Sequence, residues 1–574
     1  MAVTLLLSFL LAGPVLLLVS TISALHRNYS TARKIGLPIL IQPVSYSNPL
    51  WLMLGRHIAP WFKYLPFGLG RTVSRVGFSG WEWAQKHSIH QEYGPGFVIV
   101  TPVHNWLYTC DGETLYGIFY GERQGSIERP TELWAMLNCF GPNVITATGE
   151  DWRRHRKVTA AAFTDKTSRL AWEEALKQGD QLLSYWKSAG LNGVTTTPRD
   201  CKTVALNILI GAGFGRSSSF VGGENEGEEG ESDRLGYHSS LRLILENILV
   251  VFLIGAKTLG RVNLHWPAFV SRLSKAFRSF QLHMKYDFER AKASLREKGS
   301  TEGTLMANLV RAYVEAEESS NFSISEQEVF GNMFAYNFSG HDTTARSLNF
   351  TFYLLAAYPE VQDWMREEIQ HVLGDRSTST PNYELIPRLN RCLAVMHEVL
   401  RLYHVLGIVP RRAQGQTDLS IGGKTYSIPP QTLLLFNMHA AHVDPRYWGD
   451  DNLEFKPSRW IEISPTATVE EGPELLLLDR EVLLKPLRTV YMSWLDASHV
   501  CPGRKFSQVE YVGLIVSLLG THYVEPARAS PAEDMAHARQ RTKDCLANSG
   551  TKLVFEMLRP EAVPLVWRPC DSKE

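Results

Sequence analysis

The chain has 574 residues, of which 59 are basic and 59 acidic, so its formal net charge is zero. This length supports a large core in one or several domains, and the neutral balance gives no indication of a nucleic-acid partner. The seven cysteines are scattered and include no Cys-x-x-Cys pair, a pattern typical of reduced cytosolic thiols and unlike a disulfide framework or a zinc site.

The first 25 residues are predicted to anchor the chain in a membrane. Ala2 to Leu25 carry no charge and are long enough to cross a bilayer. A cleaved signal peptide is the alternative, but no basic residue precedes the run, which exceeds a typical h-region. Basic side chains within 26–34 follow directly, so the positive-inside rule places the rest of the chain in the cytosol. We expect a single transmembrane helix over 1–25, a Pro-containing membrane-surface linker over 26–50 and the folded domain over 51–574.

Beyond the linker, the pattern predicts a mainly α protein with small β-sheets (α+β). Residues 97–101 and 106–109 are short apolar runs and are expected to pair as strands. Helical periodicity dominates further along, with one long pattern over 327–358 and another that begins just after residue 503. Residues 217–236, rich in Gly, Ser and Glu, are predicted to be a disordered surface insert.

A single cysteine lies in a short loop just before the last of these helices. Cys501 is followed by Pro502 and Gly503. A cysteine at a helix start meets the positive end of the helix dipole, which favours the thiolate, and a thiolate on haem iron promotes cleavage of an O–O bond. An ordinary buried cysteine beside a turn is the alternative. The loop Trp494 to Phe506 resembles the haem-ligand loop of the cytochrome P450 superfamily, F-x-x-G-x-R-x-C-x-G, with Cys501 at the ligand position.

This loop departs from the family pattern at three positions. Trp494 replaces the usual Phe, and Ala497 stands where a Gly normally relieves a tight turn. His499 replaces the Arg whose charge meets a haem propionate, and a histidine with a solution pKa of about 6.5 is only partly charged near neutrality. The departures leave open a second hypothesis, in which a haem-poor member of the family acts as a lipid-binding or partner-binding protein.

Two helical pairs elsewhere resemble further motifs of the family. Trp152 and Arg156 are four residues apart on one helix face and resemble the W-x-x-x-R pair that reaches a haem propionate; a solvated basic face is the alternative. Glu398 and Arg401 resemble the E-x-x-R pair. The family joins that pair to a later Arg, here Arg459 of Phe-Lys-Pro-Ser-Arg-Trp, in a buried ion network.

The stretch Phe338 to Thr344 resembles the oxygen-activation motif A/G-G-x-D/E-T-T of the same family. The resemblance implies that Gly340, which costs about 1 kcal/mol in mid-helix, opens a groove for dioxygen. Thr343 would bend the helix and present its hydroxyl, while Asp342 would relay protons from solvent. A Thr-rich stretch that faces polar neighbours is the alternative. By its offset from the E-x-x-R helix, Arg411 is expected to be a further propionate-binding residue.

Together these motifs imply a haem-thiolate monooxygenase that inserts one atom of dioxygen into an organic substrate. Cys501 would be the axial ligand of heme b, with Gly503 beside it. Because no flavin or nicotinamide motif follows the loop, electrons are expected from a separate NADPH-cytochrome P450 reductase. Arg153, Arg154 and Lys157 form part of its docking face, or else a merely solvated one. The resemblance also implies the endoplasmic reticulum membrane, with the catalytic domain in the cytosol.

The substrate is expected to be a lipophilic small molecule. Segments within 127–143 and 238–266 lie where the family builds its pocket and are rich in Leu, Ile, Phe and Trp, which suits an apolar cavity. The motifs resemble those of ascomycete enzymes of secondary metabolism, so a terpenoid or a polyketide is the expected substrate. A haem-thiolate isomerase, which needs no reductase, is a third hypothesis and is disfavoured by Thr343.

Overall fold

A computed structural model describes residues 2–220, 234–261, 266–298, 303–318, 324–374, 381–464, 477–486, 489–496, 499–551 and 554–570, with the backbone alone for 2–12, 298, 316–318 and 408. The helices are α1 Ala2–Arg33, α2 Pro49–Ile58, α3 Arg71–Val76, α4 Trp81–Gln85, α5 Ser88–Tyr93, α6 Gly112–Gln124, α7 Gly149–Ala161, α8 Asp165–Lys187, α9 Thr197–Phe214, α10 Tyr237–Glu246, α11 Ile248–Ile254, α12 Ala256–Leu259, α13 Ala268–Lys298, α14 Leu305–Glu318, α15 Glu326–Ala357, α16 Pro359–Leu373, α17 Asn390–Leu402, α18 Met438–Ala441, α19 Pro445–Trp448, α20 Arg504–Leu519 and α21 Met535–Ala547. The strands are β1 Ile39–Ile41, β2 Gly96–Val100, β3 Asn105–Thr109, β4 Ile127–Glu128, β5 Ile408–Ala413, β6 Thr417–Ile421, β7 Lys424–Ile428, β8 Leu433–Asn437, β9 Ile461–Ile463, β10 Glu481–Leu483, β11 His522–Pro526, β12 Ser549–Thr551, β13 Phe555–Met557 and β14 Leu565–Pro569.

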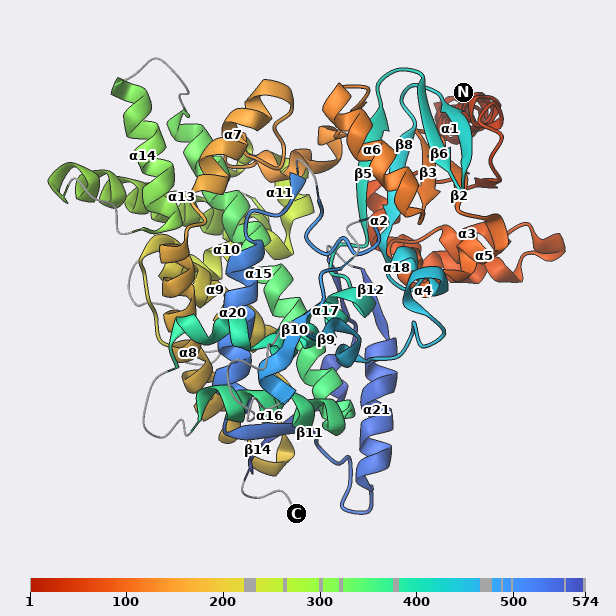
Figure 1. Cartoon of the computed structure of the whole chain (residues 1–574). Coiled ribbons are helices and arrows are strands. Elements are labelled where there is room, and N and C mark those ends of the chain that lie inside the picture. The colour runs from red at the N-terminus through yellow and green to blue at the C-terminus, as the bar shows by residue number, and fades with distance from the viewer. Residues whose placement is uncertain are drawn as a thin grey trace.

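The largest sheet has six strands in the order β1-β2-β3-β8-β5-β4 and lies at one side of the molecule (Figure 1). The predicted strand pair is confirmed, because β2 and β3 pair antiparallel with Val98 opposite Leu107. Successive side chains alternate between faces, so Val98 and Leu107 join one apolar cluster while Ile99 and Trp106 join another. Through β8 the sheet also holds β5, which carries Arg411 opposite Leu434.

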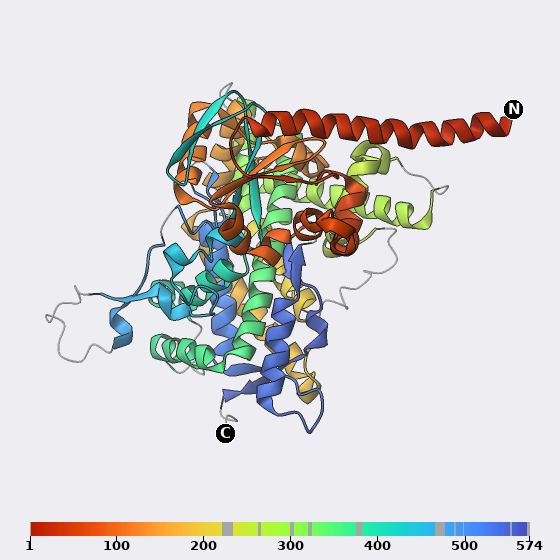
Figure 2. The same cartoon turned by 90° about the vertical axis from the view of Figure 1, so that its right-hand side faces the viewer.

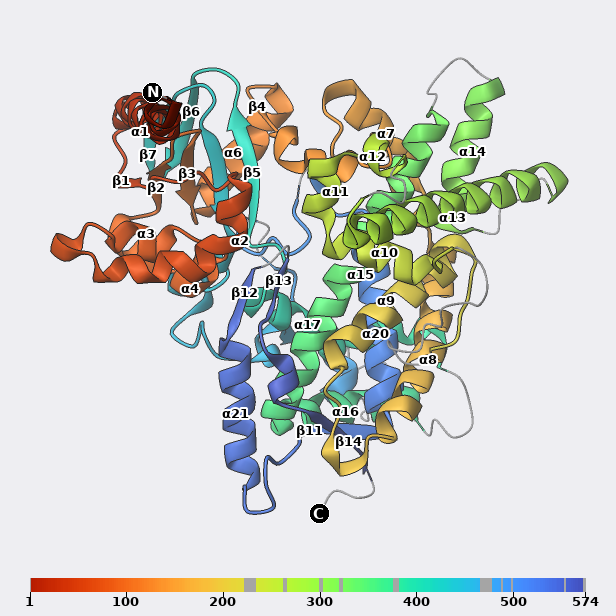
Figure 3. The ribbon, with the colours of Figure 1, turned by 180° about the vertical axis from the view of Figure 1, so that it is seen from behind.

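The long helices fill the other side of the molecule, where α15 and α20 pack together (Figures 1 and 3). Both were predicted from their apolar periodicity and both are confirmed. The position of α20 against α8 depends on two glycines. A Cβ at Gly513 would lie 2.8 Å from the Cβ of Ala175, and a Cβ at Gly179 would lie 2.6 Å from the Cβ of Ser517. Glycine therefore lets the helix that follows Cys501 approach its neighbour closely.

At the N-terminus, α1 projects from the body as one long helix (Figure 2) and ends at Arg33, beyond the predicted end at Leu25. Among the described residues, no single helix combines the length and the apolar composition of a membrane span; α10 and α11 meet both criteria only as a pair, bent by 77°. The side chains of residues 1–12, within the predicted anchor, lie outside the described part.

The predicted linker over 26–50 differs from the structure. Ile39–Ile41 forms β1, which pairs in parallel with β2. Ile35 and Leu40 are buried, so burial of apolar side chains draws this segment into the folded domain, where its extended backbone pairs as a strand and is not a free linker. The folded domain thus begins before residue 51. Most of the predicted insert over 217–236 lies outside the described residues.

Candidate active site

Cys501 lies at the end of a tight loop that leads directly into α20. The loop reverses at Leu495, which has a left-handed φ of 58°, and the Leu495 amide donates to the Met492 carbonyl at 2.9 Å. The Cys501 amide then donates to the Trp494 carbonyl at 2.8 Å. Gly503 occupies the N-cap of α20. The strained residue of this loop is thus Leu495, a position that the motif did not single out; Ala497 lies outside the described residues.

The Cys501 side chain is exposed, yet burial raises the pKa of its thiol, against the lowering effects of the Gly503 amide and of Arg156. A Cβ at Gly503 would make an ordinary contact with the Cys501 sulfur at 3.9 Å, so glycine leaves this side of the sulfur without a side chain, although no clash requires it. The expected thiolate therefore does not follow from the helix end alone; a bound metal ion would supply it, since a coordinating thiol is deprotonated outright.

Helix α7 contacts the two residues that precede the cysteine. The ring of Trp152 lies 4.2 Å from that of His499, centroid to centroid. The Arg156 guanidinium donates to the Val500 carbonyl at 2.7 Å. Burial lowers the pKa of Arg156 and the nearby Cys501 raises it. The structure therefore brings both residues of the predicted W-x-x-x-R pair to the cysteine loop.

His499 belongs to a compact charged cluster. Its Nε2 lies 2.7 Å from Oε1 of Glu122, a residue of α6, and the same oxygen lies 3.1 Å from Nε of Arg411. The opposite ring nitrogen of His499 lies 3.5 Å from Arg129. Burial lowers the pKa of His499, and Arg129 and Arg411 act in the same direction against Glu122. The imidazole is therefore neutral near pH 7 and does not carry the charge of the Arg that it replaces.

Arg411 points inward and Arg412 points outward. Arg411 is 3% exposed, and among the described residues neither its Nε nor its Nη2 has a hydrogen-bond partner; the 3.1 Å contact of Nε with Glu122 is an ion pair without hydrogen-bond geometry. Arg412 instead pairs with Glu128 at 2.7 Å and with Glu132. A buried guanidinium with an unused donor suits an anionic group such as a propionate. Arg411 also reaches an otherwise apolar cavity lined by Leu115, Ile118, Phe119, Val409, Leu434, Phe436, Met438, Met492 and Leu495.

On α15, Ser339 is exposed and Thr343 half-buried, although most of the helix lies in the core. The Thr343 hydroxyl donates to the Ser339 carbonyl at 2.8 Å, as predicted. Tyr336, two turns earlier, contributes with Cys501 to the electrostatic environment of Arg156, so this helix passes close to the cysteine loop. The accessible thiol, the side of the sulfur that Gly503 leaves without a side chain, the unused Arg411 donor and the Thr343 hydroxyl together fit a haem.

Asp342 and Gly340 face other neighbours. One Asp342 oxygen lies 3.1 Å from Nζ of Lys202 and 3.2 Å from Nε of Arg346. Burial raises the pKa of Asp342, but Arg346 and Lys202 outweigh it and lower the pKa below its ordinary value. A Cβ at Gly340 would lie 3.0 Å from Leu209 of α9, so close helix packing is one reason for glycine here. The structure thus holds Asp342 as a carboxylate in an ion pair, one residue away from the Thr343 hydroxyl.

The predicted ion network is confirmed. Glu398 lies 2.8 Å from Arg401 and 3.0 Å from Arg459. Glu398 and Arg401 are both fully buried. The network ties α17 to the segment around Arg459, which precedes the cysteine loop in the chain.

The predicted docking residues differ in their surroundings. Arg153 is 68% exposed and pairs with Glu150, whereas Arg154 is 22% exposed and lies 2.5 Å from Glu328 at the start of α15. Arg154 therefore serves to hold α7 against α15. The lining of the apolar cavity includes neither predicted pocket segment, 127–143 or 238–266.

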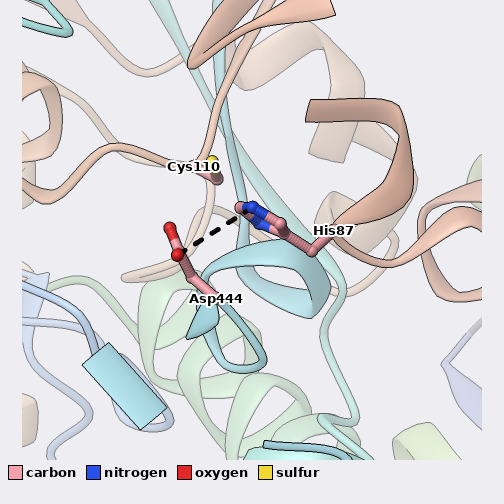
Figure 4. Close-up of side chains that lie close together, drawn as sticks. All are labelled: His87, Cys110 and Asp444. Carbon is pink, nitrogen blue, oxygen red and sulfur yellow. Dashed lines mark ion pairs between the residues drawn. The ribbon is translucent and has the colours of Figure 1, made fainter. Parts of the chain in front are cut away.

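A separate cluster joins His87, Cys110 and Asp444 (Figure 4). Nε2 of His87 lies 3.9 Å from Oδ1 of Asp444. Both Asp444 oxygens accept hydrogen bonds from Arg446, the shortest at 2.6 Å. Burial, and then Asp444, raise the pKa of the Cys110 thiol to about 12. A metal ion at this cluster would have to displace a guanidinium and deprotonate this thiol, so we assign the cluster a structural role.

The sequence did not identify two residues of the site, Glu122 and Arg129. Glu122 lies near the end of an amphipathic helix, and nothing local distinguishes it from a solvated acid. Arg129 lies inside a segment that was noted only for its apolar content. Both residues belong to the site through partners that are more than 280 residues away in the chain, Arg411 for Glu122 and His499 for Arg129. A family alignment would have been the signal, because single-sequence periodicity carries no information on such contacts.

Known proteins resemble this chain over most of its length. Residues 79–474 match the family model described as Cytochrome P450. The "Phomenoic acid biosynthesis cluster cytochrome P450 monooxygenase" of Leptosphaeria maculans is 28% identical, over 87% of this chain and 88% of that protein. Cytochrome P450 monooxygenase ORF6 of Penicillium roqueforti is 26% identical, over 86% and 87%. The crystal structure of a cytochrome P450 (CYP102L1) has a TM-score of 0.62 at 18% identity, over 86% of this chain and 95% of that one, a likeness of fold. The family match ends before the Cys501 loop, so the choice of ligand depends on the motif and on the geometry above.

Proposed function

This chain belongs to the cytochrome P450 family and is a cytochrome P450 monooxygenase with a haem-thiolate cofactor; we propose that Cys501 is its axial ligand and that it oxygenates a lipophilic fungal secondary metabolite. The observation that carries the proposal is the accessible thiol at the start of α20, with Trp152 and Arg156 on the loop before it. When bound, the haem supplies the activation of dioxygen.

The side chains around the cysteine loop have different roles in this proposal. Cys501 would hold the iron, Gly503 leaves one side of the sulfur without a side chain, and Arg411 would offer its unused donor to a propionate. Because the Thr343 hydroxyl donates a hydrogen bond to the Ser339 carbonyl, its oxygen is left to accept one.

Asp342 is the candidate for proton supply. Its ion pairs with Lys202 and Arg346 keep it ionised. Because the Lys202 side chain is 38% exposed, this partner connects the Asp342 carboxylate to solvent. Transfer of a proton to Thr343 would require Asp342 to exchange one of these partners for a water molecule.

The proposed class of substrate depends on the relatives and on the motifs that resemble fungal enzymes of secondary metabolism. One relative is named for a biosynthesis cluster, and a terpenoid or polyketide is the substrate that we propose. The cavity beside Arg411 has a volume of about 20 Å³, which is too small to be the substrate pocket. The electrons would come from a separate NADPH-dependent cytochrome P450 reductase. Arg153 is an exposed candidate for its docking face.

We place the protein in the endoplasmic reticulum membrane, with one N-terminal span and the catalytic domain in the cytosol. The uncharged run over 2–25 and the basic residues within 26–34 support this placement. Resistance to carbonate extraction, together with protease sensitivity of the domain in sealed microsomes, tests it. Release by carbonate would contradict the anchor, and protection from protease would contradict the orientation.

The first experiment is a carbon monoxide difference spectrum of the reduced protein in microsomes. Cys501→Ala is expected to abolish the red-shifted Soret band of a thiolate-ligated haem, and Cys570→Ala, the matched control near the C-terminus, is expected to leave it unchanged. A band that survives in Cys501→Ala would overturn the ligand assignment. If the wild type shows the band, reconstitution with a reductase and a panel of terpenoids and polyketides follows, with new oxygenated products as the readout.

A further inference from the structure

We propose that Arg129, His499, Glu122 and Arg411 form a network that replaces the single Arg of the family pattern at position 499, and that Glu122 is its positioning residue. The proposal depends on the haem binding argued above. The four side chains come from four different parts of the chain: the segment after β4, the cysteine loop, α6 and β5. Together they surround the point where the family pattern places one propionate-binding cation.

Glu122 is the centre of the network. Its Oε1 lies 2.7 Å from Nε2 of His499 and 3.1 Å from Nε of Arg411. These three side chains are 10%, 12% and 4% exposed, respectively, so the pairs are poorly screened by solvent. One carboxylate oxygen thus fixes both the loop before Cys501 and the guanidinium on β5.

The protonation of His499 follows from its partners. Nε2 donates to Glu122, and Nδ1, 3.5 Å from Nη1 of Arg129, is left as an acceptor. Both nitrogens are therefore used by a neutral imidazole with its proton on Nε2. The positive charge at this place belongs to Arg129. That guanidinium is held by the carbonyl groups of Val144 and Ile145, and Glu122 is the carboxylate that favours its charged form.

The network offers cations to an anionic group of the haem. Two of its four members are guanidinium groups, Arg129 and Arg411, and one is the Glu122 carboxylate. The Nη2 group of Arg411 has no hydrogen-bond partner among the described residues and is the donor that a propionate would use.

Two effects of Glu122→Gln oppose each other, and this makes the proposal testable. If Glu122 merely competes with propionates for cations, its neutralisation strengthens haem binding. If it positions His499 and Arg411, its neutralisation weakens binding, because the orienting hydrogen bond with His499 and the ion pair with Arg411 are lost. We expect the second effect to dominate, with haem lost about ten to a hundred times faster.

The rate is measured by transfer of haem from the full-length holoprotein to an excess of apomyoglobin. Glu122→Gln is compared with Glu113→Gln, a control on the same helix, and with Glu122→Asp, which keeps the charge and is expected to restore part of the retention. The midpoint potential of the iron is the second readout. Loss of a buried negative charge beside the haem raises it, whereas a loosened fold does not shift it in a defined direction.

A double-mutant cycle with His499→Gln completes the test. Because Glu122 acts partly through His499, the effects of the two substitutions are expected to be less than additive. Additive effects, or slower haem loss in Glu122→Gln, would overturn the positioning role. Wild type without a thiolate-type Soret band would refute the proposed function itself, so failure of the function and failure of this inference give different results.

Discussion

The substitution Glu398→Gln removes the negative charge of the buried ion network and keeps the shape of the side chain. The Glu398 carboxylate accepts five hydrogen bonds: two from Arg401 at 2.8 Å, one from Nε of Arg459 at 3.0 Å, one from the Lys456 amide at 3.0 Å and one from the Trp460 indole at 2.9 Å. Each carboxylate oxygen accepts at least two of them. Either orientation of a Gln amide therefore points its NH2 group at two donors.

The expected loss of stability follows from the charge of Arg401, which stays buried in the variant. Arg401 is 0% exposed, and its other N–H groups already donate to the carbonyls of His442, Asn452 and Glu454, so it cannot turn to solvent. An uncompensated buried charge of this kind costs about 3–5 kcal/mol. We expect Glu398→Gln to lower the free energy of unfolding by that amount and to reduce the yield of haem-loaded protein.

Pulse proteolysis across a urea series measures the change in the full-length protein, since it needs no reversible thermal transition. The matched control is Glu92→Gln, which removes a carboxylate that is 36% exposed and pairs with Arg71 and Arg75. Surface pairs contribute about 0–1 kcal/mol. A loss below about 1 kcal/mol in Glu398→Gln, or equal losses in both variants, would refute the reasoning.

Three further predictions concern α15, its contact with α7, and Glu82 of α4. Thr343→Ala is expected to lower product formation by about a hundredfold while peroxide release rises, and the buried Thr344→Val is the control; unchanged coupling of electrons to product would remove Thr343 from the site. Arg154→Gln is expected to cost about 1–3 kcal/mol near pH 7. Burial acts to raise the pKa of Glu328, but the hydrogen bonds from Arg154 and from the N-cap serine of α15 lower it to about 2. The ionised Glu328 therefore stabilises the folded state fully above the ordinary carboxyl pKa, and this contribution is lost as pH falls through 2. The gap between wild type and variant should therefore narrow in unfolding curves between pH 5 and pH 3, and a constant gap would contradict the assignment. Burial raises the pKa of Glu82 to about 7, so the wild type loses stability as pH rises from about 4.5 to 7; Glu82→Gln should be more stable by about 3 kcal/mol at pH 8 and no more stable at pH 4.5, as pulse proteolysis at the two pH values can check.

The parts of the site that could be predicted are those whose partners are close in the chain or lie on long periodic helices. The bounds of α15 and α20 followed from apolar spacing, and the Thr343 bond to Ser339 is a local i to i−4 contact. The partner of the E-x-x-R pair was predicted as well, but only through the family resemblance, because Arg459 is 61 residues away from Glu398.

The remaining features depend on which side of an element faces which neighbour. The family resemblance assigned Gly340 to a groove for dioxygen, which stays a prediction, and the structure adds a close approach to Leu209 of α9 that the sequence did not indicate. The helix dipole predicted a low thiol pKa, but burial at Cys501 has the larger effect. The prolines within 26–50 suggested a linker, although β1 pairs with β2 there. Each difference is a tertiary effect that overrides a correct local tendency.

The difference between local patterns and tertiary contacts also matters for the haem-poor hypothesis. That hypothesis depended on the loop alone, where His499 brings no charge that is comparable with the usual Arg. In the folded chain Arg129 and Arg411 lie on either side of the His499–Glu122 pair, so cations are present although the motif lacks one. A chain that had lost its haem would gain nothing from a buried guanidinium with an unused donor, since such a group costs stability unless a ligand pairs with it. The departure at 499 is therefore better explained as a relocation of charge within a working site than as decay of the site.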